Sequence, residues 1–448
     1  MMNLDYTQLT GELITRDNFL YEKERKQWNR AIEKYPLAII YCNNEEDVSN
    51  AVLWARKNKL PIRIRSGRHH YEGYSIGNNV LVIDVSRMNS IFIDEDKGIV
   101  KIQGGVRNRE LYEATGRRGY PFPGGGCPTV GVVGFTLGGG WGYSSRLLGL
   151  GCDSLVEVEL INYEGNKIVA NNEVNKDLFW ALRGSGGGNF GVVVGMTFKL
   201  PSKIKNGTLI NIDCPINDID DKVELFYVYQ NMFKTLDYRC NFKMAVYNSK
   251  EKGKGIKFTG VFYGTKAEAN EAIMPIKKMA INISVDMQYM SVPEINEVIQ
   301  NSHPDYESYK SAGRFINRDY SKEEIRRLIE LVSDRAEGSI YTAISLYGLG
   351  GRVSESNMNE TSFYYRDAKF IVGFQSVWED SKYAEVNREW TLKRLNEIKK
   401  MTTGSFVNFP LGELEDFAKE YYGENANKLK EIRKIYDPHK VFAFEQGL

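Results

Sequence analysis

The 448-residue sequence predicts an α+β protein with two different parts and a C-terminal tail that returns to the first part. Residues 1–200 hold most of the glycine clusters and short apolar strand-like runs. After Pro201 such clusters become rare, and strand-like runs alternate with long charged helical segments, which is typical of an antiparallel sheet covered by helices. We therefore expect three segments, 1–200, 201–401 and 402–448.

The first part combines short strands with two clear helices. Residues 45–57 have the apolar spacing of an amphipathic helix, and residues 108–118 predict a second helix that ends near Gly119. Short apolar runs bounded by turn residues predict strands. These strands are expected over 62–65, 80–85, 91–93, 99–103, 156–162, 167–170 and 192–200.

In the second part and the tail, the expected strands and helices are longer than in the first part. Strands are expected over 241–247, 256–263, 340–346 and 368–377, and helices over 219–236, 266–280, 321–336 and 383–401. In the tail we expect a strand over 404–409 and one helix over 412–435, which ends before Asp437-Pro438.

Composition excludes several classes of protein. With 42% hydrophobic and 26% charged residues the chain is of globular type, and 59 basic against 58 acidic residues argue against a broad nucleic-acid surface. Apolar runs are shorter than the about 20 residues that span a bilayer, and the N-terminus does not resemble a secretion signal. Five scattered cysteines without a CxxC pair predict neither a disulfide framework nor a zinc site. We expect a cytoplasmic protein without membrane or nucleic-acid partners; a spore or surface layer and the oligomeric state stay open.

Glycine-rich loops are the main functional signal. The run Gly186–Gly191 matches a dinucleotide fingerprint, but a strand-like run follows it instead of the required helix, so we reject a Rossmann fold. Three other loops, Arg65–Gly73, Pro123–Gly131 and Gly138–Gly142, lie beside short strands. Glycine lets backbone N–H groups converge on an anion and lets the chain approach a flat ring. The loops indicate a ligand with a pyrophosphate and a planar ring, or they are simply tight turns.

Two of these loops contain reactive side chains. His69 and His70 are two of only four histidines, and neighbours in extended chain point in opposite directions, so at most one faces a ligand. Cys127 lies between three glycines and a proline. It is either a thiol beside the ligand or a small buried apolar residue.

The combined motifs resemble the berberine bridge enzyme-like family of FAD-linked oxidases. The pattern R-S-G-x-H-x-x-E-G matches Arg65–Gly73, C-P-T-V-G matches Cys127–Gly131, and G-G-G-x-G matches residues 138–142. The resemblance continues at residues 178–184, 188–191 and 436–438 and at Gln446, in the family's order along essentially the whole chain. It implies a two-part FAD-binding domain of the vanillyl-alcohol-oxidase (PCMH) type, and a substrate domain whose antiparallel sheet covers the flavin.

By this resemblance FAD is bound bicovalently, with His69 bonded to the flavin 8α-methyl group and Cys127 to C6. A neutral imidazole and a thiolate are suitable nucleophiles for these bonds. His70 is the rival for the histidyl bond, and Arg68 stands where many members have glycine. The expected FAD contacts are Arg65, Ser66, Gly67, Arg68, His69, His70, Ser75, Cys127, Thr129, Val130, Gly131, Gly134, Gly138, Trp141, Gly191, Val193 and Asn408.

The resemblance also bears on the electron acceptor. Valine at the position of Val130 is associated in the family with oxidases, so we expect O2 to reoxidise the flavin after a small-molecule substrate has reduced it. The alternatives are a dehydrogenase with another acceptor, and a structural coat or surface protein with a vestigial flavin.

The catalytic base of the family has no counterpart here. The tyrosine motif Y-x-N-Y reads Phe406-Val-Asn408-Phe409, and the acidic position reads Gln375. Phenylalanine carries no titratable proton, and a neutral amide is a very poor base. The substrate is then oxidised without strong base help, or another residue acts, or activity has been lost. The candidates for a catalytic role are Gln375, Tyr143, Tyr364, Tyr365, His70 and Glu72.

Aromatic residues replace polar ones at several positions near this expected site. Trp141 stands where many plant members have tyrosine, and Phe135 stands where the family has histidine. Together with Phe409 they either line an apolar pocket, which favours aromatic or apolar substrates over sugars, or belong to the core.

Overall fold

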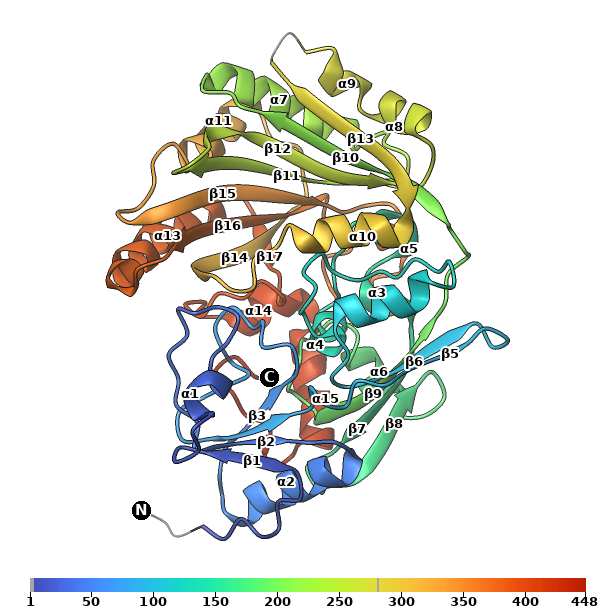
Figure 1. Ribbon diagram of the computed structural model, residues 1–448, viewed down its shortest axis with the longest axis vertical. Coiled ribbons are helices and arrows are strands. Elements are labelled where there is room, and N and C mark those ends of the chain that lie inside the picture. The colour runs from blue at the N-terminus through green and yellow to red at the C-terminus, as the bar shows by residue number, and fades with distance from the viewer. Residues whose placement is uncertain (1–3, 280–281) are drawn as a thin grey trace.

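The computed structural model describes residues 4–279 and 282–448, and this part of the chain forms three β-sheets (Figure 1). Two small sheets are built from residues up to Lys199, and the large sheet begins at Asn206. The α+β class is confirmed. The expected boundary near residue 201 falls between the last strand of the small sheets and the first strand of the large one.

The small sheets differ in type. The first is mixed, with order β1-β2-β4-β3, and its strands are Glu12–Thr15, Ala38–Tyr41, Leu81–Asp84 and Ile62–Arg65. The second is antiparallel, with order β5-β6-β9-β7-β8, and its strands are Ile91–Asp94, Ile99–Gln103, Val192–Lys199, Leu155–Ile161 and Lys167–Asn171. Helices of this half are α1 (Tyr21–Glu24), α2 (Glu45–Lys57), α3 (Asn108–Gly116), α4 (Val132–Leu137), α5 (Ser145–Leu148) and α6 (Lys176–Ala181).

The large sheet has eight antiparallel strands in the order β13-β10-β12-β11-β15-β16-β14-β17. In that order they span Ser284–Ser291, Asn206–Cys214, Gly253–Phe262, Cys240–Ser249, Ser339–Gly348, Phe370–Trp378, Ser308–Ile316 and Thr403–Ser405. Its helices are α7 (Ile219–Met232), α8 (Lys266–Ala272), α9 (Met274–Lys277), α10 (Val292–Asn301), α11 (Lys322–Glu330), α12 (Arg352–Glu355) and α13 (Ala384–Lys399).

The tail connects the two halves. Strand β17 pairs with β14 at the edge of the large sheet, and then α14 (Phe417–Tyr422) and α15 (Ala426–Tyr436) pack into the core beside the five-stranded sheet. In Figure 1 these two helices run from below the large sheet down between the two small ones. The tail therefore contributes to both halves.

Local sequence accounts for the element bounds where caps are strong. Helix α2 begins after Asn44, whose side chain accepts a hydrogen bond from the Asp47 amide, and its bounds are those predicted. The single helix expected over 412–435 is wrong. The helical segment is divided at Gly423, whose φ is +51°. A Cβ at this position would lie only 2.3 Å from the Tyr364 ring, so glycine leaves room for that ring. The helix expected over 266–280 is likewise two short helices as far as the described residues go; residue 280 lies outside them.

Alternation along the strands separates the two faces of the large sheet. On β11, Phe242, Met244 and Val246 are buried in the core beneath the covering helices, whereas Lys243 and Tyr247 alternate with them. Helices α7 and α11 lie on the outer side of this sheet, and the opposite face is turned toward the small sheets (Figure 1). The space between the two halves is therefore lined by residues such as Lys243.

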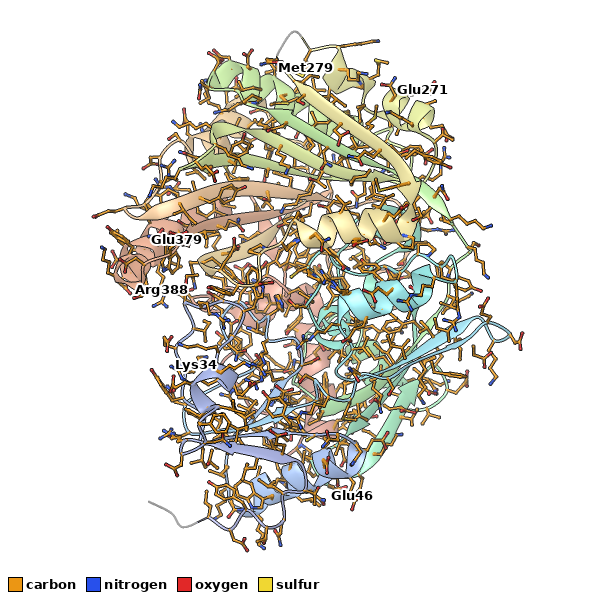
Figure 2. All side chains as sticks on the ribbon, in the orientation of Figure 1. Lys34, Glu46, Glu271, Met279, Glu379 and Arg388 are labelled. Atoms are coloured by element: carbon orange, nitrogen blue, oxygen red, sulfur yellow. The ribbon has the colours of Figure 1, made fainter. Side chains whose placement is uncertain are left out.

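Charged side chains occur at both ends of the molecule. Figure 2 shows Glu46 and Glu271 at opposite ends of the molecule, and both are exposed. No helix within the described ranges is long and apolar enough to cross a bilayer.

Candidate functional site

The first and second glycine loops are in direct backbone contact. A Cβ on Gly67 would lie 2.2 Å from the Gly131 nitrogen, and a Cβ on Gly131 would lie 2.7 Å from the Ser66 hydroxyl oxygen. A side chain at Gly67 would force the backbone to move, and one at Gly131 would displace the Ser66 hydroxyl. Glycine is required here for close packing of two loops that are more than fifty residues apart in the chain.

This packing brings His69 and Cys127 to one hydroxyl group. Nε2 of His69 lies 2.7 Å from Oγ1 of Thr129, and Sγ of Cys127 lies 3.9 Å from the same oxygen. The His69 ring also stacks on Trp28, with centroids 5.1 Å apart. Two residues that sequence reasoning paired as flavin attachment points therefore lie side by side.

Both groups are half-buried, and burial affects them differently. Burial, together with the nearby Arg107 cation, lowers the pKa of His69 to about 3, so its imidazole is neutral at physiological pH. Burial raises the pKa of the Cys127 thiol, although hydrogen bonds from Thr129 oppose this shift. The site thus holds a neutral imidazole and a protonated thiol.

His70 faces another direction. Its Nδ1 accepts backbone N–H groups of Glu72 at 3.3 Å and Tyr74 at 3.4 Å, and its ring packs against that of Tyr74. Burial and the charge of Lys34 lower the pKa of His70 to about 3. Unlike His69, His70 is occupied by its own loop.

The two arginines of the first loop are committed to carboxylates. Nε of Arg65 donates to Asp84 at 2.5 Å, and both side chains are fully buried. Arg68 has a φ of +63°, which explains why glycine suits this position, and its guanidinium donates to Glu24 at 2.7 Å. Their predicted role in binding FAD is therefore restricted to the backbone.

The second and third loops enclose an aromatic ring. A Cβ on Gly125 would lie 3.0 Å from Cε2 of Phe135, and a Cβ on Gly140 would lie 2.5 Å from Cε1 of the same ring. The absence of both Cβ atoms leaves room for the Phe135 ring. Phe135 is thus packed between loops, while Gly134 beside it is exposed, with no atom within 4 Å of its Cβ position. A bare, open backbone at Gly134 is suited to contact with a flat ring.

Other predicted contact residues surround these loops. The Asn408 side chain donates to the Phe135 carbonyl at 2.8 Å and approaches Gly138 so closely that a Cβ there would be 1.9 Å from its oxygen. Ser75 donates to Gln27 at 3.2 Å. The remaining members are Val130, which is half-buried beside Thr129, Gly191 with its φ of +153°, and Val193, which is buried in the core of the five-stranded sheet.

Four aromatic side chains, here called the aromatic wall, pack together beside the loops: Tyr71, Tyr309, Tyr347 and Phe409. Tyr71 and Phe409 stack with centroids 5.4 Å apart, Tyr309 meets Tyr71 at 5.1 Å, and Tyr347 meets Phe409 at 5.3 Å. These residues come from the first loop, the large sheet and the tail. Burial raises the pKa of Tyr71 well above its usual value, so its hydroxyl stays protonated at neutral pH.

Trp141, an expected FAD contact, and several of the candidate catalytic residues pack against other parts of the protein. Trp141 is buried and its indole N–H donates to the Gly348 carbonyl at 2.7 Å, while Tyr143 packs on Trp141 and borders a cavity of about 10 Å³ behind Gly126. Gln375 is half-buried on β16, opposite Ser311 and Ala343. The hydroxyl of Tyr365 donates to the Glu420 carbonyl, and Tyr364 packs at Gly423.

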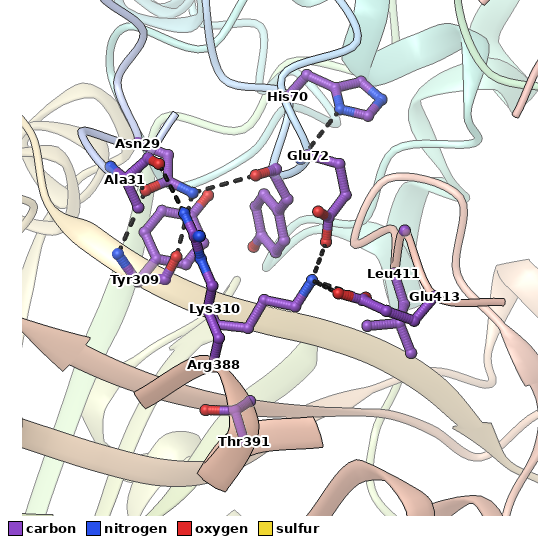
Figure 3. Close-up of polar contacts among 12 residues, drawn as sticks. Asn29, Ala31, His70, Glu72, Tyr309, Lys310, Arg388, Thr391, Leu411 and Glu413 are labelled. Carbon is purple, nitrogen blue, oxygen red and sulfur yellow. Dashed lines mark hydrogen bonds and ion pairs between the residues drawn. The ribbon is translucent and has the colours of Figure 1, made fainter. Parts of the chain in front are cut away.

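Glu72 is also engaged. Figure 3 shows the amino group of Lys310 between Glu72 and Glu413, at 2.7 and 2.8 Å. Lys310 is buried on β14, Glu72 belongs to the first loop, and Glu413 belongs to the tail. This ion-pair group joins the three segments around the site, and it leaves Glu72 no longer free to act as a base.

Three polar residues near the loops had not been predicted. All three belong to the half of the molecule that contains the large sheet: Lys243 is on β11, His303 follows α10, and Glu307 precedes β14. Their positions carry no motif, and the pairing of β14 was not expected from the sequence. A larger cavity, of about 510 Å³, lies elsewhere, at the turn after β11 beside residues 333–339.

These residues fit FAD. Glycine loops in backbone contact, an open position at Gly134, and a neutral imidazole beside a thiol suit a planar electrophilic ring. Among the described residues no cluster of His, Cys, Asp or Glu is arranged to hold a metal ion.

Comparison with known proteins agrees. Residues 36–171 match the model of an FAD binding domain, and residues 405–448 match the berberine and berberine like model. The uncharacterized FAD-linked oxidoreductase YgaK of Bacillus subtilis (strain 168) is 34% identical over 99% of this chain and 98% of its own. The monolignol oxidoreductase AtBBE-like 13 of Arabidopsis thaliana is 25% identical over 90% and 82%.

The solved structure of Physcomitrella patens BBE-like 1 has the same fold, with a TM-score of 0.90, 24% identity, and coverage of 98% of this chain and 97% of that one. Fold and family together define an oxidoreductase that uses FAD. The chain belongs to the berberine bridge enzyme-like family of FAD-linked oxidoreductases.

Proposed function

We propose that this protein is an oxidase that holds FAD through both His69 and Cys127. The substrate is a small aromatic or apolar alcohol, amine or phenol, and O2 accepts the electrons. The observation that carries the proposal is the meeting of these two side chains at the Thr129 hydroxyl, within 2.7 and 3.9 Å. A ring bonded to both residues would be fixed at two positions.

The residues of the site have distinct tasks in this proposal. His69 would supply a neutral nitrogen for the 8α-methyl carbon, and Cys127 would supply sulfur for C6. Each new bond would replace one C–H bond of the ring system and the N–H or S–H bond of the side chain, and O2 would take up the two electrons and two protons as peroxide. FAD, when bound, provides the acceptor for a hydride from a substrate carbon. Thr129 orients both attachment residues, and the contact between Gly67 and Gly131 keeps the loops together.

The aromatic wall supports an aromatic substrate. Tyr71, Tyr309, Tyr347 and Phe409 offer ring faces and edges, with which an aromatic substrate can stack. Phenylalanine at residue 409 removes a hydroxyl that a sugar could bond to. A monolignol, the compound class in the name of the Arabidopsis relative, is therefore a better first substrate than a sugar; 4-hydroxycinnamyl alcohol is one such aromatic alcohol.

The proposal is tested on protein expressed with riboflavin supplied. It should stay yellow after acid precipitation, and a peptide containing Cys127 should carry the mass of FAD together with a peptide containing His69. Anaerobic mixing with 4-hydroxycinnamyl alcohol should bleach the flavin faster than mixing with cellobiose. Air should then restore the colour within seconds and produce peroxide. Complete loss of colour on precipitation rejects the bonds, and slow recovery in air identifies a dehydrogenase.

Two glycine replacements separate folding from cofactor binding. Gly67→Ala should lower both stability and flavin content, because its Cβ would overlap the Gly131 backbone. Gly134→Ala should retain the thermal stability of the flavin-free protein, because its Cβ points into open space, but should lower flavin content severalfold. Thermal unfolding and flavin absorbance per protein measure both effects. Full flavin content in Gly134→Ala would place the ring away from α4.

A further inference from the structure

His303 lies against the loop that carries Cys127. It follows helix α10, and a Cβ on Gly126 would lie 3.3 Å from its Cε1 and 3.7 Å from its Nε2. The ring therefore borders the backbone immediately before the proposed cysteinyl attachment point. C6 and N5 are neighbouring positions on one edge of the flavin ring system, so with Cys127 bonded to C6, a group beside Cys127 would lie on the side where hydride would be accepted.

The hydrogen bond of His303 defines which nitrogen is free. Nδ1 lies 3.0 Å from the Ile299 carbonyl oxygen, and since a carbonyl only accepts, Nδ1 carries the hydrogen. In the neutral ring Nε2 then has an unshared pair. Across residues 4–279 and 282–448, Nε2 makes no hydrogen bond to the protein. The helix end thus orients the ring and leaves its basic nitrogen available.

The surroundings keep this ring neutral. Burial and the positive charge of Lys243 lower the pKa of His303, while its backbone hydrogen bonds at Ile299 and Gln300 oppose this shift. Nearby titratable groups include His69 and Cys127 of the glycine loops and Glu307 of its own connection. The Arg109 guanidinium of α3 donates to the side chains of Gln300 and Asn301 at the end of α10. Burial raises the pKa of the Glu307 carboxyl, which Lys243 partly offsets. A neutral imidazole near pH 7 is able to accept a proton.

Other groups at the site are poorly suited to the same task. Phe409 and Gln375 stand where family members carry hydroxyl and acidic groups, and neither is a base. Tyr71 stays protonated, because burial raises its pKa well above the usual value. Glu72 is held by Lys310 at 2.7 Å.

We propose that Nε2 of His303 is the proton acceptor when the substrate is oxidised. This inference rests on the proposed function. For an alcohol, the hydroxyl proton passes to Nε2, the carbinol carbon gives a hydride to the flavin, and the C–O single bond becomes a double bond. The substrate loses two electrons and two hydrogens, and the flavin is reduced by the same two electrons, which O2 later takes up as peroxide. His303 then releases its proton to water.

The test uses the flavin-loaded protein and its His303→Gln variant under anaerobic conditions with 4-hydroxycinnamyl alcohol. The first-order rate of flavin bleaching should fall about 100-fold to 10,000-fold, the usual contribution of a general base. Both flavin bonds, the absorption spectrum and thermal stability should be unchanged. The exposed His439, replaced in His439→Gln, is the matched control and should bleach at the wild-type rate.

The pH profile distinguishes a proton acceptor from a structural residue. The rate of flavin bleaching in wild type should increase with pH in the range below neutrality, because His303 must lose its proton to act; this part of the profile is the acid limb. The His303→Gln variant should lack the acid limb. Lys243→Met removes the cation that lowers the pKa of His303, so the limb should move to higher pH. Because the chain has only four histidines, carbon-13 labelled histidine gives a readout independent of turnover. The histidine signal that is absent in His303→Gln belongs to His303. It should titrate with a pKa below the ordinary value for histidine, and Lys243→Met should raise that pKa.

Three outcomes would overturn the assignment. Bleaching of His303→Gln within threefold of wild type would show that another group takes the proton. If Glu307→Gln instead lost the acid limb, the carboxylate would be the acceptor. A wild-type protein that is purified yellow but is bleached by no alcohol, amine or phenol would reject the proposed function itself, whatever the histidine signals show.

Discussion

A His69→Ala, Cys127→Ala double variant is expected to release all of its flavin on acid precipitation, whereas wild type releases none. His69→Ala alone should keep FAD on the peptide of Cys127, and Cys127→Ala alone should keep it on the peptide of His69. The reason is geometric, because both side chains reach the same Thr129 oxygen while their loops are held together at Gly67 and Gly131. Mass spectra of tryptic peptides report each bond separately.

His70→Ala provides the control for this series. Nδ1 of His70 is occupied by two backbone N–H groups of its own loop, so the variant should retain the histidyl bond. Persistence of a histidyl bond in His69→Ala would instead make His70 the attachment residue. A flavin bonded in the double variant would show that neither residue is required.

Asp84→Ala is expected to destabilise the protein by about 3–5 kcal/mol, since it leaves a buried cation without its partner. Arg65 and Asp84 are both fully buried, with Nε and Oδ2 2.5 Å apart, and Arg65 further donates to the Glu24 carbonyl at 2.8 Å. This pair lies at the ends of β3 and β4, where the first glycine loop begins. Denaturant unfolding followed by circular dichroism and by flavin fluorescence should show the loss.

Glu12→Gln is the matched control, because the Glu12–Arg87 pair is also 2.5 Å long but has side chains 46% and 40% exposed. Its loss should cost no more than about 1 kcal/mol. An Arg65→Met, Asp84→Leu double variant should recover much of the stability, since no charge is left buried. A cost below about 1 kcal/mol for Asp84→Ala would mean that solvent reaches Arg65.

Much of the secondary structure was predictable because it depends on local patterns. The cap at Asn44 and the apolar spacing that follows it define α2, and strands β3 and β6 have the bounds that their apolar runs predict. Strands β1, β2, β10, β13 and β14 were missed. Each takes its conformation from pairing with a strand far away in the chain, and β13, at the edge, has few buried side chains to mark it.

The tail shows the same limit. Helical periodicity continues across Gly423, so the sequence predicts one helix, whereas the glycine adopts a left-handed conformation and Tyr364 fills the space beside it. Likewise, the sequence cannot distinguish glycines that leave a surface open to a ligand from glycines that make room for another side chain. Gly134 leaves an open surface, while Gly125 and Gly140 make room for Phe135.

The sequence by itself determined the family, the three glycine loops, the two candidate attachment residues, and the replacement of the family's hydroxyl and acidic groups by Phe409 and Gln375. These are properties of residue type and spacing, which a linear chain displays directly. Only the tertiary structure decided that His69, and not His70, lies beside Cys127, and that His303 borders the same loop with Lys243 close enough to act on it. Such neighbours depend on how distant strands pair and how two halves pack, and no local pattern records that.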